Sequence, residues 1–186
     1  MEIKAADVMK LRKMTGAGMM DCKNALMEAE GDFARAQDII REKGKLVVAK
    51  RAERNASEGV VVTRIVGTKA YMLCLACETD FVGSNAKFTG FASKVAEVVA
   101  TTEPADVDAL LEKPMGEETV SSELTEMIHI MGENMKISRF AARKAENGAL
   151  ASYIHMGGKI GVLVEFAFEK AETAQAESFK TFAHDV

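Results

Sequence analysis

A short apolar run at residues 71–77 limits most strongly what this chain can fold into. The run reads YMLCLAC, and an uninterrupted apolar segment of this length is typical of a buried strand. Residues 60–65 upstream (VVVTRI) are rich in β-branched side chains, and Gly67 and Thr68 between the two segments can form a turn. We therefore expect a β-hairpin at this point in the chain.

The segment that follows the apolar run combines a charged residue with a large aromatic one. Asp80 and Phe81 arrive together where the chain should turn, between Thr79 and Val82. Burying the Phe81 ring is favourable by roughly 1.5–3 kcal/mol, whereas Asp80 beside it resists leaving water without a partner. A self-contained domain gains little from this combination at a loop tip. We interpret residues 79–82 as a protruding wedge directed at another protein.

The first 45 residues predict a compact bundle of three short helices. Apolar residues recur at helical spacing in three groups: Ala5, Val8, Leu11 and Met14; Met19, Cys22, Leu26 and Ala29; Phe33, Ala36, Ile39 and Ile40. Asp32 is placed to cap the third helix and Gly44 to end it. Residues 46–58 are basic and lack an apolar face, so we expect an exposed linker there.

The remainder predicts two related α+β units. After the hairpin, the pattern favours helices over residues 88–99, 103–111 and 123–132, and a strand over 135–142. Gly148 and Ile154 later repeat the six-residue spacing of Gly59 and Ile65, and each pair precedes a turn and a second apolar run. A similar order of elements is typical of an internal repeat.

The expected fold class is therefore α+β, with a three-helix domain (1–45), a linker (46–58), a first core subdomain (59–141) and a second one (142–186). Residues 173–186 begin a helix without a C-terminal cap. We expect the second subdomain to be incomplete and the chain to be a truncated form.

Composition excludes several functional classes. The net charge of −4 argues against a general nucleic-acid or anionic-membrane binder. No stretch approaches the ~18 apolar residues of a membrane span, and residues 1–4 lack the apolar region of a signal peptide. Three cysteines, two of them in apolar runs, favour reduced thiols and a cytoplasmic location.

No motif predicts an enzyme, a metal site or a cofactor. Cys74 and Cys77 match the C-x-x-C spacing, but this spacing on a strand directs the two side chains to opposite faces. We interpret them as buried structural thiols rather than as a redox or zinc pair. Residues 157–159 (GGK) precede Ile160 rather than a hydroxyl residue, which is typical of a hairpin turn and not of a phosphate-binding loop.

Two further positions are candidates for contact with a partner. Met19 and Met20 are adjacent on a helix, roughly 100° apart, so both cannot point into one small core. Met19 continues the apolar face, which leaves Met20 for the surface, either as an ordinary half-buried methionine or as a docking contact beside Arg12. His155 lies in a predicted strand near a glycine pair, and this position suits an edge histidine and a contact residue equally well.

Three motifs together resemble the bacterial translation elongation factor Ts family. Residues 11–26 (LRKMTGAGMMDCKNAL) closely resemble its N-terminal motif, and residues 78–82 (ETDFV) resemble its second motif. Residues 153–155 (YIH) together with 158–165 (GKIGVLVE) resemble a third. The motifs occur in the family's order and span almost the whole chain.

The resemblance implies a guanine-nucleotide exchange factor that binds elongation factor Tu and has no catalytic residue, metal or cofactor of its own. Asp80 and Phe81 would enter between helices of the GTPase domain and disturb its magnesium site, with Thr79 and Val82 completing the motif. No direct contact with nucleic acid or a membrane is implied.

The same resemblance assigns supporting roles to other positions. Arg12, Met19 and Met20 would brace the GTPase domain from a ubiquitin-associated-like helical domain. His155 would face the partner from the core, which contacts a second domain of elongation factor Tu as well.

Two alternatives stay open. A ubiquitin-associated-like or chaperone-like binding module without exchange activity is compatible with the first 45 residues, but it does not explain residues 79–82. A thiol–disulfide enzyme built on Cys74 and Cys77 is the more distant alternative.

Overall fold

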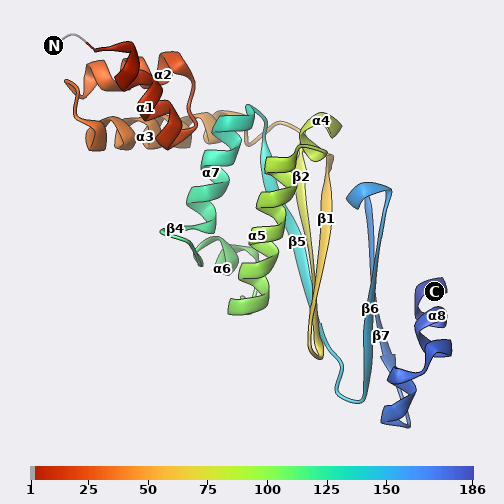
Figure 1. Cartoon of the computed structure of the whole chain (residues 1–186). Coiled ribbons are helices and arrows are strands. Elements are labelled where there is room, and N and C mark those ends of the chain that lie inside the picture. Colours follow the sequence, from red (N-terminus) through yellow and green to blue (C-terminus); the bar gives the residue numbers. More distant parts are fainter. Residues whose placement is uncertain (1–2) are drawn as a thin grey trace. The chain divides into compact units, whose positions relative to one another are not determined.

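The computed structural model describes residues 3–186, and Figure 1 shows their helices and strands. These residues form two compact units. Unit 1 combines the chain up to residue 55 with residues 122–135, and unit 2 combines residues 56–121 with 136–186. Helices and small antiparallel sheets together confirm the α+β class.

Unit 1 is built on α1 (Ala5–Thr15), α2 (Met19–Glu28) and α3 (Phe33–Arg51). Their shared core is made of small and medium apolar side chains that are almost fully buried: Val8, Leu11, Ala17, Cys22, Ala25, Leu26, Ala29, Ala36 and Ile40. Asp32 caps α3 as predicted, because its Oδ1 accepts hydrogen bonds from the Ala34 and Arg35 amides at 2.8 and 3.1 Å.

Three details of these helices differ from the sequence-based prediction. Gly44 does not end the third helix: it is buried within α3, which continues to Arg51 and so includes the start of the expected linker. Met19 is 42% exposed, since it is the first residue of α2 and Ala17 occupies the core position ahead of it. Ala5 and Met14 are exposed as well, so α1 contributes Val8 and Leu11 to the core.

A distant segment completes unit 1. Helix α7 (Val120–Met131) and the residues after it are held to the end of α3 by side-chain hydrogen bonds. Arg51 Nη1 donates to the Ile128 carbonyl at 3.0 Å, and the buried Asn134 donates from Nδ2 to the Arg54 carbonyl at 2.7 Å. The predicted domain boundaries did not include this association.

Unit 2 contains a sheet with strand order β1-β2-β5, formed by β1 (Glu58–Val66), β2 (Lys69–Cys77) and β5 (Met135–Lys144). The predicted hairpin is confirmed, with Glu58 opposite Cys77 and Val66 opposite Lys69. Helix α5 (Ala86–Thr102) packs on β1 and β2. The largest fully buried side chains of this layer are Phe88, Val95 and Val99 from α5, and Leu73 and Leu75 from β2.

Short elements follow α5: α6 (Val107–Leu111), β3 (Pro114–Met115) and β4 (Glu118–Thr119). The short helix begins later than predicted, because Asp106 caps it by accepting a 2.7 Å hydrogen bond from the Ala109 amide. Glu103 instead ends α5 in a left-handed conformation with φ of 44°.

A second hairpin is formed by β6 (Gly148–His155) and β7 (Ile160–Ala167), joined by the 3-10 turn η1 (Met156–Gly158), and this confirms the predicted hairpin turn. It packs against β1 within unit 2. The final segment forms η2 (Ala171–Gln175) and α8 (Glu177–Asp185), where the Phe179 ring packs edge-on against Phe166 and Phe168.

Of the two cysteines of β2 that were predicted to be buried, only Cys77 is fully buried. Cys77 is fully buried beside Gly83, whereas Cys74 is partly buried near Val61 and Met72. Among residues 3–186, His, Cys, Asp and Glu side chains do not gather in a group of three that could hold a metal ion. None of the helices described is both long and apolar enough to cross a membrane.

Candidate partner-binding site

The segment that follows β2 is an ordered helical turn. Thr79 is the N-cap of the one-turn helix α4 (Asp80–Gly83), and its Oγ1 accepts a hydrogen bond from the Val82 amide at 3.4 Å. The Gly83 amide donates to the Thr79 carbonyl at 3.0 Å, and the Ser84 amide donates to the Asp80 carbonyl at 2.9 Å. The backbone of the turn is therefore closed by local hydrogen bonds.

This turn presents Phe81 to solvent. The Phe81 side chain is 84% exposed, Asp80 is exposed, and Val82 is partly buried. Phe88, in the first turns of the next helix, is fully buried and shows that unit 2 can accommodate an aromatic ring. Leaving Phe81 outside forgoes roughly 1.5–3 kcal/mol of burial, so its exposure leaves a strong apolar group available for a partner.

Gly83 seats the turn on the beginning of β1. Gly83 is buried, and a Cβ added there would lie 3.4 Å from the Gly59 carbonyl oxygen and 3.6 Å from Cys77 Sγ. The Cys77 thiol also donates to the Thr79 carbonyl at 3.1 Å. The turn therefore rests directly on the backbone of the first hairpin, and a large side chain at position 83 would displace it.

The turn of the second hairpin reaches the same stretch of β1. The Lys159 ammonium forms an ion pair with the Glu58 carboxylate. This hydrogen bond raises the pKa of Lys159, and the nearby Asp80 charge acts in the same direction, so Lys159 stays cationic at neutral pH. Charges of both signs therefore surround the seat of α4.

His155 lies at the end of β6, next to this turn. Its side chain is exposed, and its Nδ1 lies 2.9 Å from the Tyr153 hydroxyl, with the two rings 5.7 Å apart. Because η1 packs on β1 near the seat of α4, the structure brings His155 and residues 79–82 to one end of unit 2.

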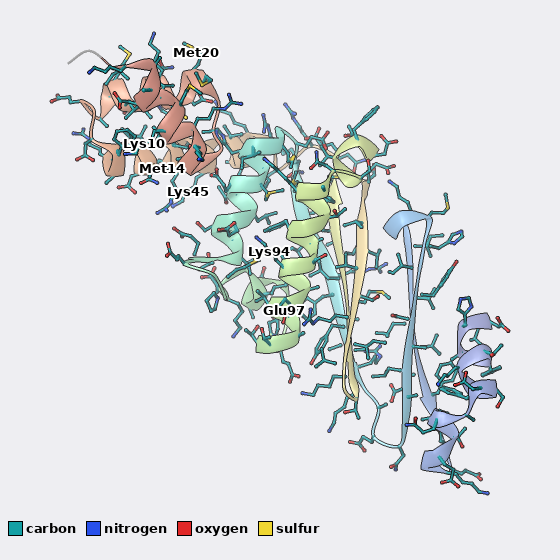
Figure 2. All side chains as sticks on the ribbon, viewed as in Figure 1. Lys10, Met14, Met20, Lys45, Lys94 and Glu97 are labelled. Carbon is teal, nitrogen blue, oxygen red and sulfur yellow. The ribbon has the colours of Figure 1, made fainter. Side chains whose placement is uncertain are left out.

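The other predicted contact residues belong to unit 1. Arg12 is exposed near the end of α1, and its carbonyl accepts a 2.7 Å hydrogen bond from the Gly16 amide, which has φ of 71°. The turn then leads into α2, where Met20 is 65% exposed and lies on the surface of unit 1 (Figure 2). Arg12, Met19 and Met20 are thus all accessible.

Comparison with known proteins shows what these elements belong to. Residues 78–186 match the family model described as elongation factor TS, and the match begins directly before α4. The chain belongs to the elongation factor Ts family. Elongation factor Ts of Trichlorobacter lovleyi is 44% identical over 191 residues, which cover 100% of this chain and 61% of the relative.

Other relatives have a similar sequence identity and are also longer than this chain. Elongation factor Ts of Clostridium perfringens strain SM101 is 47% identical over 96% of this chain and 60% of the relative. Elongation factor Ts of Clostridium tetani is 46% identical over 90% of this chain and 57% of the relative. The chain thus spans about three-fifths of the length of the elongation factor Ts relatives it matches.

Two features near the candidate site were not predicted from the sequence. Glu58 and Lys159 form their ion pair across 101 positions of the chain, and one sequence gives no signal for such a pair. Met156 is 69% exposed and has φ of 51°, which is uncommon for a residue other than glycine. The two glycines after Met156 could have indicated this turn as a specialised surface.

Proposed function

We propose that this chain acts in translation elongation as a guanine-nucleotide exchange factor: it binds elongation factor Tu carrying GDP and promotes GDP release. Family membership supports the role in elongation. The observation that carries the proposal is the exposed Phe81 side chain on the hydrogen-bonded turn α4.

The proposed mechanism is the insertion of α4 between helices of the partner's GTPase domain. Moving the Phe81 ring from water into an apolar site is favourable by roughly 1.5–3 kcal/mol, which can offset part of the cost of separating packed helices. GDP is held by phosphate-binding amides and by Mg²⁺, whose charge compensates the phosphates. A shift of the elements that position Mg²⁺ weakens both supports and lowers the affinity for GDP.

Thermodynamic linkage gives this mechanism a second consequence. If the exchange factor lowers the affinity of its partner for GDP, GDP must lower the affinity for the exchange factor by the same factor. A coupling of ~3 kcal/mol corresponds to roughly two orders of magnitude in each affinity. The protein makes and breaks no covalent bond, so it needs no acid, base or metal of its own for this action.

The remaining predicted contacts would orient the wedge. Arg12, Met19 and Met20 offer an exposed cation and two flexible apolar side chains, a combination suited to docking on a protein surface. His155 would contact elongation factor Tu from unit 2, at the end where α4 lies. Such a function places the protein in the cytoplasm, where translation takes place.

The direct test is the release of a fluorescent GDP analogue from elongation factor Tu in the presence of excess unlabelled GDP and Mg²⁺. We expect substoichiometric amounts of the chain to accelerate release at least tenfold and to act repeatedly. Absence of acceleration despite complex formation in gel filtration would leave a binding module as the better description. Absence of both complex and acceleration would reject the partner.

A further inference from the structure

Three contacts from two different segments converge on the first residues of β1. From α4, Gly83 packs against the backbone of Gly59, because a Cβ added at Gly83 would lie 3.4 Å from the Gly59 carbonyl oxygen. From the turn of the second hairpin, a Cβ added at Gly158 would lie 2.4 Å from Val60 Cγ2, and the next residue, Lys159, pairs with Glu58. All of these residues belong to unit 2.

The turn α4 needs such external support. It has one turn, and helices of this length are not stable by themselves because too few hydrogen bonds offset the cost of nucleation. Its exposed Phe81 ring also favours any rearrangement that would bury it against nearby apolar surface. The position of the ring therefore depends on how firmly α4 is seated.

The first residues of β1, on which α4 is seated, lie at an edge of the sheet. In the order β1-β2-β5, β1 has a strand partner on one side only among the residues described, and Glu58 is its first residue. Strand ends at the edge of a sheet open with low free energy. A side chain that ties the start of β1 to a second hairpin should keep this end closed.

The charges near the start of β1 favour such a link to the second hairpin. Lys159 bonds to Glu58 and also lies near enough to Asp80 to be influenced by its charge. The Lys159 cation is thus paired with the carboxylate of Glu58 on β1 and lies within electrostatic range of Asp80 on α4. Gly158 permits the close approach, because it has φ of 98° and no side chain.

We propose that Lys159 and Glu58 are positioning residues, which use the turn of the second hairpin to hold α4 on β1 with Phe81 projecting outwards. The consequence for nucleotide exchange rests on the proposed function, whereas the consequence for the order of α4 does not.

The test compares Lys159→Glu, Glu58→Lys and the double variant that exchanges the two charges. Hydrogen–deuterium exchange of the Gly83 and Ser84 amides reports the hydrogen bonds of α4 directly. We expect Lys159→Glu to accelerate exchange of these amides roughly three- to ten-fold, since each exposed charge pair alters an equilibrium by roughly two- to five-fold. The double variant should recover part of the wild-type rate, because it re-forms the ion pair between positions 58 and 159 but places a negative charge near Asp80. Lys159→Gln serves if the charge reversal does not fold, and Lys170→Glu, at the other end of the hairpin, is the matched control.

GDP release from elongation factor Tu provides the second measurement. Positioning predicts that Lys159→Glu lowers the maximal release rate while changing the half-saturating concentration less than twofold, and that the double variant recovers part of the rate. Unchanged Gly83 and Ser84 exchange in Lys159→Glu and Lys159→Gln overturns the proposal. A loss of activity that the double variant does not recover even in part also overturns it and assigns Lys159 to direct partner contact. If the wild-type chain releases no GDP, the proposed function fails, and amide exchange alone still decides the proposal.

Discussion

Replacing Phe81 or Phe88 with alanine should have very different effects on the stability of unit 2, because only one of the two rings is buried. About a sixth of the Phe81 side chain is buried, because 84% of it is exposed. Full burial of a phenylalanine is worth roughly 1.5–3 kcal/mol, so Phe81→Ala should lower the free energy of unfolding by about 0.2–0.5 kcal/mol. Phe88 is fully buried, and Phe88→Ala should cost about 3–5 kcal/mol through lost transfer energy and a cavity.

Urea denaturation followed by tyrosine fluorescence measures both effects. The chain has no Trp, and its two tyrosines, Tyr71 and Tyr153, both lie in unit 2 together with Phe81 and Phe88. The signal therefore reports the unfolding of this unit, and an unchanged m-value would show that the extent of unfolding is the same in each variant. A loss above about 1.5 kcal/mol for Phe81→Ala would mean that the ring packs within its own unit and is not presented to a partner.

Three further outcomes test other parts of the structure. Met20→Ala should weaken binding to elongation factor Tu in a titration by roughly three- to tenfold and leave the melting temperature almost unchanged, because Met20 is 65% exposed; melting of unit 1 would instead make Met20 a core residue. Burial raises the pKa of Glu126, with Glu123 adding repulsion, so the folded state binds its proton more tightly and stability should fall as pH rises from about 4.3 through the raised pKa. Glu126→Gln should flatten this slope in thermal melts, and an identical slope would contradict the assignment. Asn134→Ala should lower the stability of unit 1 by about 1–3 kcal/mol, measured as faster amide exchange in α3, and an unchanged rate would show that its hydrogen bond to Arg54 is dispensable.

Local patterns in the sequence were sufficient to predict most of the helices and strands. The hairpin at residues 58–77 follows from β-branched and apolar runs around a short turn, and the Asp32 cap follows from side-chain chemistry. Gly44 was misjudged because its low helix propensity is outweighed by packing within unit 1, where the residue is buried. The position of Met19 depended on Ala17, which fills the core from the preceding turn.

Long-range associations could not be predicted in the same way. The hydrogen bonds that join α7 to the end of α3 link residues 77 or more positions apart, and their donors, Arg51 and Asn134, are unremarkable in the sequence. At the candidate site, too, the local feature was predicted from the sequence and the long-range contact was not. The pairing of Asp80 with Phe81 at a strand end suggested a projecting side chain, and Phe81 is indeed exposed, while its role in partner binding stays a prediction. The packing of α4 on Gly59 could be seen only in the folded structure.

GDP release at saturating exchange factor shows at which step Phe81 acts. The release rate from elongation factor Tu should be compared for the wild-type chain, Phe81→Ala and Phe182→Ala, a control at an aromatic residue of α8 that is 56% exposed. Loss of roughly 1.5–3 kcal/mol of ring burial predicts that Phe81→Ala still saturates its partner but releases GDP about 10- to 100-fold more slowly, with Phe182→Ala near wild type. A wild-type release rate for Phe81→Ala at saturation would mean that the Phe81 ring does not act in the release of GDP.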